Sequence, residues 1–123
     1  MSPSGPMEIS RGQIYFVELN PTPGSAREQA GRRLVLVVST NSINRQPLVV
    51  TVIVGTAAVH CPRDFPTNIR VTAAESGLPA DTVFLGFQLR SLDHARFLHP
   101  QAGRLAPARM ADVEQALRHV LNL

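Results

Sequence analysis

The chain has 123 residues, a formal net charge of +3 and a single cysteine. That length suits one domain with one modest hydrophobic core, so binding and chemistry must share a single fold. One cysteine excludes an intramolecular disulfide, and no apolar run approaches the length of a membrane span. We therefore expect a cytoplasmic protein with no membrane partner.

All twelve basic residues are arginines. The planar guanidinium group binds phosphate in a bidentate manner, and the positive balance of the chain favours an anionic partner. A GC-rich coding bias that replaces lysine by arginine would give the same composition. Residues 1–10 lack the basic and apolar segments of a signal peptide. We predict a short disordered tail over 1–10 and a single domain over 11–123.

Short segments rich in β-forming residues follow one another along the chain. The predicted strands are residues 11–19, 34–38, 47–54, 69–72 and 82–89. Residues 20–31 are rich in turn formers and polar groups, which is typical of a surface loop that carries function. We also expect a turn over 75–79 and one helical turn over 91–97 with Ser91 as its cap.

The periodicity changes after Gly103. Pro107 stands where a helix can begin, and apolar residues then recur at three- and four-residue spacing at Met110, Val113, Leu117, Val120 and Leu121. The chain is therefore predicted to end in an amphipathic helix that packs on a sheet. Consecutive short strands before one helix indicate an α+β domain built on a small, curled antiparallel sheet.

Several common catalytic patterns are absent from the sequence. There is no Gly-rich phosphate loop, no Cys or His pair at metal-binding spacing and no nucleophile elbow. His60 and Cys61 are adjacent, but neighbouring side chains in a strand point to opposite faces, and a lone cysteine is usually a small apolar filler. We expect neither a metal site nor a cofactor.

The dipeptide Arg32-Arg33 closes the polar loop at the mouth of a buried strand. Burying two guanidinium groups is costly, so at least one of them should lie on the open face of the strand, where it can clamp a phosphate. Two solvated arginines beside Glu28 are the other interpretation of this pattern.

Several motifs, in the right order, resemble those of the MazF/PemK toxins. The first is Arg-Gly-Gln-Ile-Tyr-Phe-Val-Glu-Leu-Asn-Pro-Thr at 11–22, which is followed by Gly24-Ser25, Glu28-Gln29-Ala30-Gly31 and Arg33. Later motifs are Phe-Pro-Thr-Asn-Ile at 65–69, Thr-Val-Phe-Leu at 82–85 and Gln-Leu-Arg-Ser-Leu-Asp at 88–93. The resemblance thus extends from Arg11 to the final helix.

This resemblance implies a fold and an activity. The fold is an SH3-like barrel, a curled antiparallel sheet of the CcdB/PemK type with a C-terminal amphipathic helix, and the toxin acts as a homodimer. The activity is sequence-specific, metal-independent cleavage of single-stranded RNA, in which the 2′-hydroxyl of the substrate attacks and leaves 2′,3′-cyclic phosphate and 5′-hydroxyl ends. The site has to supply charge stabilisation and proton transfer. A MazE-like antitoxin is the expected partner, with an acidic tail that blocks the RNA groove.

Position by position, the resemblance assigns two catalytic residues. Arg33 matches the family's motif arginine, which would stabilise the pentacoordinate phosphorane and take part in proton transfer. Thr56 is the best match to the catalytic threonine that holds the scissile phosphate, although an ungapped alignment from Pro47 places Gly55 there and a strand-end hydroxyl can instead cap a turn. The expected RNA-binding residues are Asn20, Ser25, Arg27, Glu28, Gln29, Arg32, Phe87 and Gln88.

The chain departs from the family pattern at three places. Leu34 replaces a proline, Ala26-Arg27 is an insertion in a loop where Ala30 also replaces a glycine, and Phe87 replaces a glutamate and could stack on an unpaired base. These departures affect base preference more than activity. Two alternative functions remain: a CcdB-like, gyrase-poisoning toxin and a non-catalytic RNA- or protein-binding barrel. CcdB relatives end in a tail that contains tryptophan, whereas this chain has none.

Overall fold

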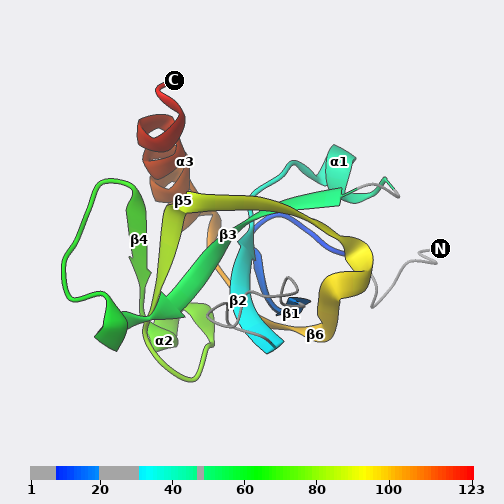
Figure 1. The fold of residues 1–123 in the computed structure, drawn as a ribbon, viewed down its shortest axis with the longest axis horizontal. Helices are drawn as coiled ribbons and strands as arrows, with labels where there is room; N and C mark the ends of the chain where they lie inside the picture. Colours follow the sequence, from blue (N-terminus) through cyan, green and yellow to red (C-terminus); the bar gives the residue numbers. More distant parts are fainter. Residues whose placement is uncertain (1–7, 20–30, 47–48) are drawn as a thin grey trace, which may run out of the picture.

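The computed structural model describes residues 8–19, 31–46 and 49–123. In this part of the chain, one antiparallel sheet has the strand order β4-β5-β3-β2-β1-β6 (Figure 1). The strands are β1 (Gln13–Leu19), β2 (Gly31–Val37), β3 (Val49–Ala57), β4 (Asn68–Val71), β5 (Thr82–Asp93) and β6 (Phe97–Arg104). The helices are α1 (Asn41–Asn44), α2 (Ala73–Ser76) and α3 (Pro107–Leu121), and two 3₁₀ turns are η2 (Ala58–His60) and η3 (His94–Arg96).

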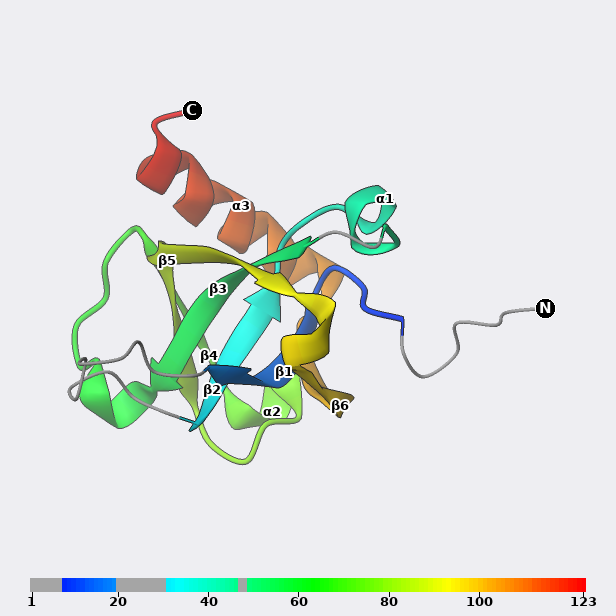
Figure 2. The same ribbon diagram turned by 45° about the vertical axis from the view of Figure 1, so that its right-hand side comes forward.

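Two irregularities in strand pairing bend the sheet. The twelve-residue β5 pairs with β3 in two stretches, and the register shifts between Ile53 and Val54 of β3. A second shift between Ile14 and Phe16 lies where β1 pairs with β6. Extra residues at such points bend a strand and increase its twist. The sheet therefore curls, as Figure 2 shows, and the predicted α+β fold with a barrel-like sheet and a C-terminal helix is confirmed.

Both faces of the central strands are apolar because successive side chains alternate between them. On one face, Ile14 and Leu36 pack in a buried cluster with Met110 and Val113 of α3. The other face carries a second buried cluster, which comprises Ile9, Tyr15, Val17, Val35, Val37, Val50, Val52, Val54, Leu92 and Phe97. The double burial explains why residues 34–37 of β2 and most of β3 form nearly continuous apolar runs in the sequence.

The C-terminal helix begins at Pro107 as predicted, but the face that it buries differs from the prediction. Ala116 is buried with Met110 and Val113, whereas Leu121 is 49% exposed at the last turn. Alanine gives a weak hydrophobic signal in a sequence, yet its small side chain lets a helix approach a sheet closely. The strand β6 was not predicted, and Pro100 interrupts its pattern of β-forming residues.

The two predicted turns differ in detail from the structure. Residues 91–97 were expected to be one helical turn capped by Ser91, but Ser91 lies in β5. The helical turn is η3, whose cap is Asp93, because its carboxylate accepts a hydrogen bond from the Ala95 N–H at 2.8 Å. The turn expected over 75–79 overlaps α2, which ends at Gly77 in the left-handed conformation.

The packed domain begins earlier than the predicted boundary at residue 11. Ile9 is only 2% exposed, and the Ser10 N–H donates to Gln13 Oε1 at 2.6 Å. The side chain of Ile9 thus belongs to the core. The prolines and serines around it gave no sign of this burial. The rest of the expected tail, residues 1–7, lies outside the described residues. Across the described ranges, no helix combines the length and apolar character needed to cross a membrane.

Candidate active site

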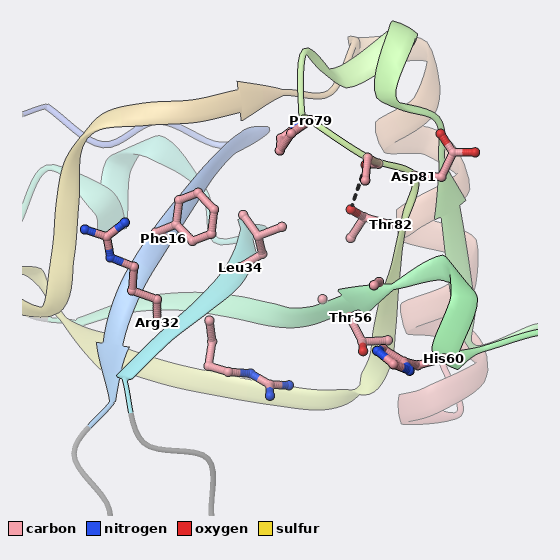
Figure 3. A pocket seen from close by; sticks show the side chains of 12 residues that line it. Phe16, Arg32, Leu34, Thr56, His60, Pro79, Asp81 and Thr82 are labelled. Carbon is pink, nitrogen blue, oxygen red and sulfur yellow. Dashed lines mark hydrogen bonds between the residues drawn. The ribbon is translucent and has the colours of Figure 1, made fainter.

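A pocket of about 330 Å³ opens at the end of the sheet where β2 begins and β3 ends (Figure 3). This volume is near the lower end of the range for small-ligand sites, which is about 300–1,000 Å³. Its walls come from β1, β2, β3 with η2, and the segment that enters β5. The described residues that line it are Phe16, Arg32, Arg33, Leu34, Gly55, Thr56, Ala57, His60, Pro79, Ala80, Asp81 and Thr82.

Strand pairing brings Arg33 and Thr56 to this pocket. Leu34 of β2 pairs with Gly55 of β3, and continuing the antiparallel register by one residue sets Arg33 opposite Thr56. Both residues are half-buried and both line the pocket. The structure therefore unites the two residues that the sequence analysis assigned to catalysis.

Gly55, the alternative to Thr56 in the alignment, fills a different role. A Cβ atom at this position would lie 2.8 Å from Cε1 of Phe84 and 3.1 Å from Cγ2 of Thr82. Carbon atoms cannot pack at the first of these distances, so the core of the domain requires glycine here. Since Gly55 has no hydroxyl, Thr56 is the residue of this pair that can hold a phosphate through its side chain.

Three polar side chains of the pocket are available to a ligand. Within the described residues, the Arg33 guanidinium, the Thr56 hydroxyl and the His60 imidazole make no hydrogen bond or ion pair. The Asp81 carboxylate is engaged elsewhere, because it accepts a hydrogen bond from the Ala73 N–H at 2.8 Å, at the start of α2. The described lining is thus positively charged and suits an anion.

Arg32 is held at the pocket by an aromatic ring. Its Cζ atom lies 5.9 Å from the ring centroid of Phe16, which is the distance of a cation–π contact. Because Phe16 and Arg32 lie on adjacent strands, the contact restrains the exposed side chain of Arg32 next to Arg33 in the chain. Both arginines thus line the open pocket, in agreement with the prediction that at least one of them avoids burial.

Two of the other predicted RNA-binding residues, Phe87 and Gln88, do not line this pocket. Phe87 is 58% exposed and Gln88 is exposed, in the part of β5 between its two stretches of pairing with β3. The backbone is fixed just before them, since the Gly86 N–H donates to the Thr67 carbonyl at 2.8 Å and a side chain at Gly86 would collide with that carbonyl. The remaining predicted residues lie outside the described residues: Asn20, Ser25, Arg27, Glu28 and Gln29.

His60 is a residue of the pocket that the sequence analysis set aside. It was assumed to lie in a strand with Cys61, but β3 ends at Ala57 and the chain then enters the 3₁₀ turn η2. His60 lines the pocket, whereas Cys61 does not, and its Sγ atom lies 3.9 Å from Nδ2 of Asn68. The end of the apolar run at Val54 was the available signal that His60 lies beyond the strand.

This arrangement can bind a phosphodiester, stabilise additional negative charge on it and exchange a proton with it. Guanidinium, hydroxyl and imidazole groups surround one open cavity. In the ranges 8–19, 31–46 and 49–123, no group of three or more His, Cys, Asp or Glu residues is placed so as to hold a metal ion.

Comparisons with solved structures give the same fold. An endoribonuclease from a mycobacterial species, in complex with its cognate antitoxin, superimposes with a TM-score of 0.73 at 23% identity over 94% of this chain and 96% of that chain. A MazF structure from Deinococcus radiodurans gives a TM-score of 0.71 at 24% identity over 94% of this chain and 97% of that chain.

Comparisons of sequence identify the family. Endoribonuclease EndoA of Bacillus subtilis is 34% identical over 117 residues, which are 95% of this chain and 97% of EndoA. The family model of the PemK-like, MazF-like toxins of type II toxin–antitoxin systems matches residues 10–121. With nearly the whole domain matched and the expected curled sheet in place, the chain belongs to the PemK-like, MazF-like toxin family.

Proposed function

We propose that this protein is a toxin endoribonuclease that cuts single-stranded RNA at specific sequences without a metal ion. One observation carries the proposal: Arg33 and Thr56 line the same open pocket, and neither side chain has a partner within the described residues. The identity to a relative named as an endoribonuclease supports it.

In the proposed reaction, the 2′-hydroxyl of the RNA attacks the adjacent phosphorus atom. The Arg33 guanidinium donates two parallel hydrogen bonds to the non-bridging oxygens and stabilises the charge of the phosphorane. The Thr56 hydroxyl donates to the same phosphate and fixes its orientation. The bond from phosphorus to the 5′-oxygen then breaks, which leaves a 2′,3′-cyclic phosphate and a 5′-hydroxyl.

The remaining predicted residues have a role in RNA binding in this proposal. Arg32, steadied by Phe16, binds a neighbouring phosphate, while Phe87 stacks on an unpaired base next to Gln88. The loop residues that we assign to the RNA groove from the family resemblance are Asn20, Ser25, Arg27, Glu28 and Gln29.

The partners that we propose follow from the family and from the charge of the pocket. Solved relatives include an endoribonuclease with its cognate antitoxin and a MazE–MazF complex. An acidic segment of a MazE-like antitoxin would compete with RNA for the guanidinium groups of Arg32 and Arg33. We propose that the toxin itself is a homodimer and acts in the cytoplasm.

Two other functions make different predictions. The match to the PemK-like, MazF-like family favours RNA cleavage over gyrase poisoning of the CcdB kind. A non-catalytic barrel would bind RNA without cutting it. Arg33→Ala separates the two functions, because an enzyme would lose cleavage while its fold and its binding of the antitoxin persisted.

The test is incubation of the purified chain with a complex RNA pool in EDTA, followed by sequencing of the ends. We expect cuts that share a short sequence, with cyclic phosphate on one side and 5′-hydroxyl on the other. Products with 3′-hydroxyl ends, or a reaction that stops in EDTA, would contradict the mechanism. Intact RNA would contradict the activity.

A further inference from the structure

The proposed cleavage requires two proton transfers in addition to stabilisation of the phosphate. Attack by the 2′-hydroxyl releases a proton. The 5′-oxygen needs a proton as it departs, because it would otherwise leave as an alkoxide, which is a strong base and a poor leaving group. A guanidinium group releases a proton only with difficulty, and an aliphatic hydroxyl is a weak acid. Both groups are suited to binding the phosphate rather than to protonating the leaving oxygen.

The described pocket contains one side chain of a type that exchanges protons readily near neutral pH, and this is His60. Its imidazole makes no hydrogen bond within the described residues, so both ring nitrogens are accessible to a substrate. The acidic group of the described lining is less suitable, because the Asp81 carboxylate already accepts the Ala73 N–H.

The backbone of η2 holds His60 at the pocket that Thr56 also lines. The turn η2 follows β3 directly, and it is closed by a hydrogen bond of 3.0 Å from the Cys61 N–H to the Ala58 carbonyl. A second bond of 3.0 Å, from the Ala58 N–H to the Asp81 carbonyl, ties the turn to the segment that enters β5. Within this turn Val59 is 84% exposed, whereas His60 is directed to the pocket.

The pocket has two distinct ends. Figure 3 draws His60 at the same end as Thr56 and the Phe16–Arg32 pair at the other end. In an in-line displacement, the attacking and leaving oxygens lie on opposite sides of the phosphorus atom. If Arg33 and Thr56 hold the phosphate, a group at one end of the pocket reaches only one of these two oxygens.

We propose that His60 is a catalytic residue, the general acid that protonates the 5′-oxygen as it leaves. The 2′-oxygen forms its bond to phosphorus and gives its proton to water. The bond from phosphorus to the 5′-oxygen breaks, and the leaving oxygen takes a proton from the imidazolium of His60. The neutral imidazole then regains a proton from water. This inference rests on the proposed ribonuclease activity.

A change of leaving atom tests the assignment. The substrate is an oligonucleotide that the wild-type chain cuts at one site, prepared with either oxygen or sulfur at the 5′-bridging position of that linkage. A thiolate leaves without protonation, so the sulfur substrate does not need a general acid. We expect His60→Ala and His60→Gln to slow single-turnover cleavage of the oxygen substrate by about 100- to 10,000-fold. Cleavage of the sulfur substrate should slow by less than about tenfold.

Two variants serve as controls. His119→Ala removes an exposed histidine from α3, outside the pocket, and should leave both rates unchanged. Arg33→Ala should slow both substrates, because both need charge stabilisation at the phosphate. Thermal melts of each variant separate a loss of folding from a loss of chemistry.

Two results with an active wild-type chain would overturn the assignment. Equal slowing of both substrates in the His60 variants would mean that His60 does not protonate the leaving oxygen and instead accepts the proton of the 2′-hydroxyl or binds RNA. No slowing of either would mean that another group, or water, protonates the leaving oxygen. A wild-type chain that cuts neither substrate nor any RNA pool would instead overturn the proposed activity, and this inference with it.

Discussion

Arg33 stands opposite Thr56 across the β2–β3 ladder, one residue beyond the pair formed by Leu34 and Gly55. This relationship places a guanidinium and a hydroxyl on one wall of an open pocket. Residues 35–37, which lie after Arg33 in β2, are buried in the core. Residues 52–55, which lie before Thr56 in β3, are buried as well. A site on paired strands holds its geometry better than a site on loops, because the ladder restricts both backbones.

Arg33→Ala should abolish most of the cleavage while the fold persists. Removing one charge-stabilising donor from a transition state typically costs about 100- to 1,000-fold in rate. Arg33 is half-buried without a partner in the described residues, so its loss leaves no unpaired partner in the core. Single-turnover cleavage of a defined RNA measures the effect. Arg104→Ala, an exposed change in β6, is the matched control, and equal rates for the two variants would contradict the assignment.

Thr56→Val should slow cleavage by a similar factor, about 100-fold or more, because it removes the hydroxyl but keeps the β-branched shape. Thr56→Ser retains the hydroxyl and should keep most of the rate. The pair of variants separates hydrogen bonding from packing, and single-turnover rates report both. If the serine variant were as slow as the valine variant, the side-chain shape rather than the hydroxyl would matter.

Gly55→Ala should destabilise the domain. The added Cβ would lie 2.8 Å from Cε1 of Phe84, and overpacking of this kind typically costs about 1–3 kcal/mol. Urea unfolding, followed by circular dichroism, measures the change in free energy. Phe84→Leu shortens the clashing ring, so the double variant should lose less stability than the sum of the single changes. Strict additivity would show that the ring of Phe84 does not restrict position 55.

Glu75→Ala should lower stability at neutral pH by about 0.5–2 kcal/mol, because Glu75 forms a capping box with Thr72. The Thr72 backbone N–H donates to the Glu75 carboxylate at 2.9 Å, and this bond, followed by Arg109 at 3.0 Å, holds the Glu75 pKa below its ordinary value of 4.5.

The pKa of Glu75 is lower in the folded chain than in the unfolded one, so its contribution is present above the unfolded value and is lost as the pH falls through the folded value. Urea unfolding at a series of pH values should show the wild type and Glu75→Ala converging in acid. Asp112→Ala, which removes another partner of Arg109 but leaves the cap intact, is the control. If the difference in unfolding free energy between the wild type and Glu75→Ala persisted in acid, it would not come from the charged carboxylate of Glu75.

Much of the candidate site could be predicted from the sequence because its motifs are local. The Arg32-Arg33 pair at the mouth of an apolar strand signals an exposed guanidinium by the cost of burying it, and the family motifs assign Arg33 a role. Thr56 was harder to assign because one gap in an alignment shifts the position to Gly55. The ring of Phe84 leaves no room for a side chain at position 55, and the catalytic role of Thr56 stays a prediction.

His60 could not be assigned from sequence for a related reason. Whether a histidine next to a cysteine faces a pocket depends on where the preceding strand ends, and strand ends are set by pairing partners elsewhere in the chain. Here the register of β3 with β5 extends to Ala57 and Thr82, and η2 starts only after that pair.

By itself the sequence determined the class of the fold, the start of α3 at Pro107 and the family. Apolar alternation, helix signals and motif spacing are local properties of the chain, and they were sufficient to predict the fold class, the helix start and the family. Only the tertiary structure decided which side chains share a pocket, that Ile9 completes a core and that His60 joins Thr56. Such contacts join residues that are distant in sequence, and they depend on strand register. A shift of one residue in the register would turn the side chains of a strand to the opposite face of the sheet.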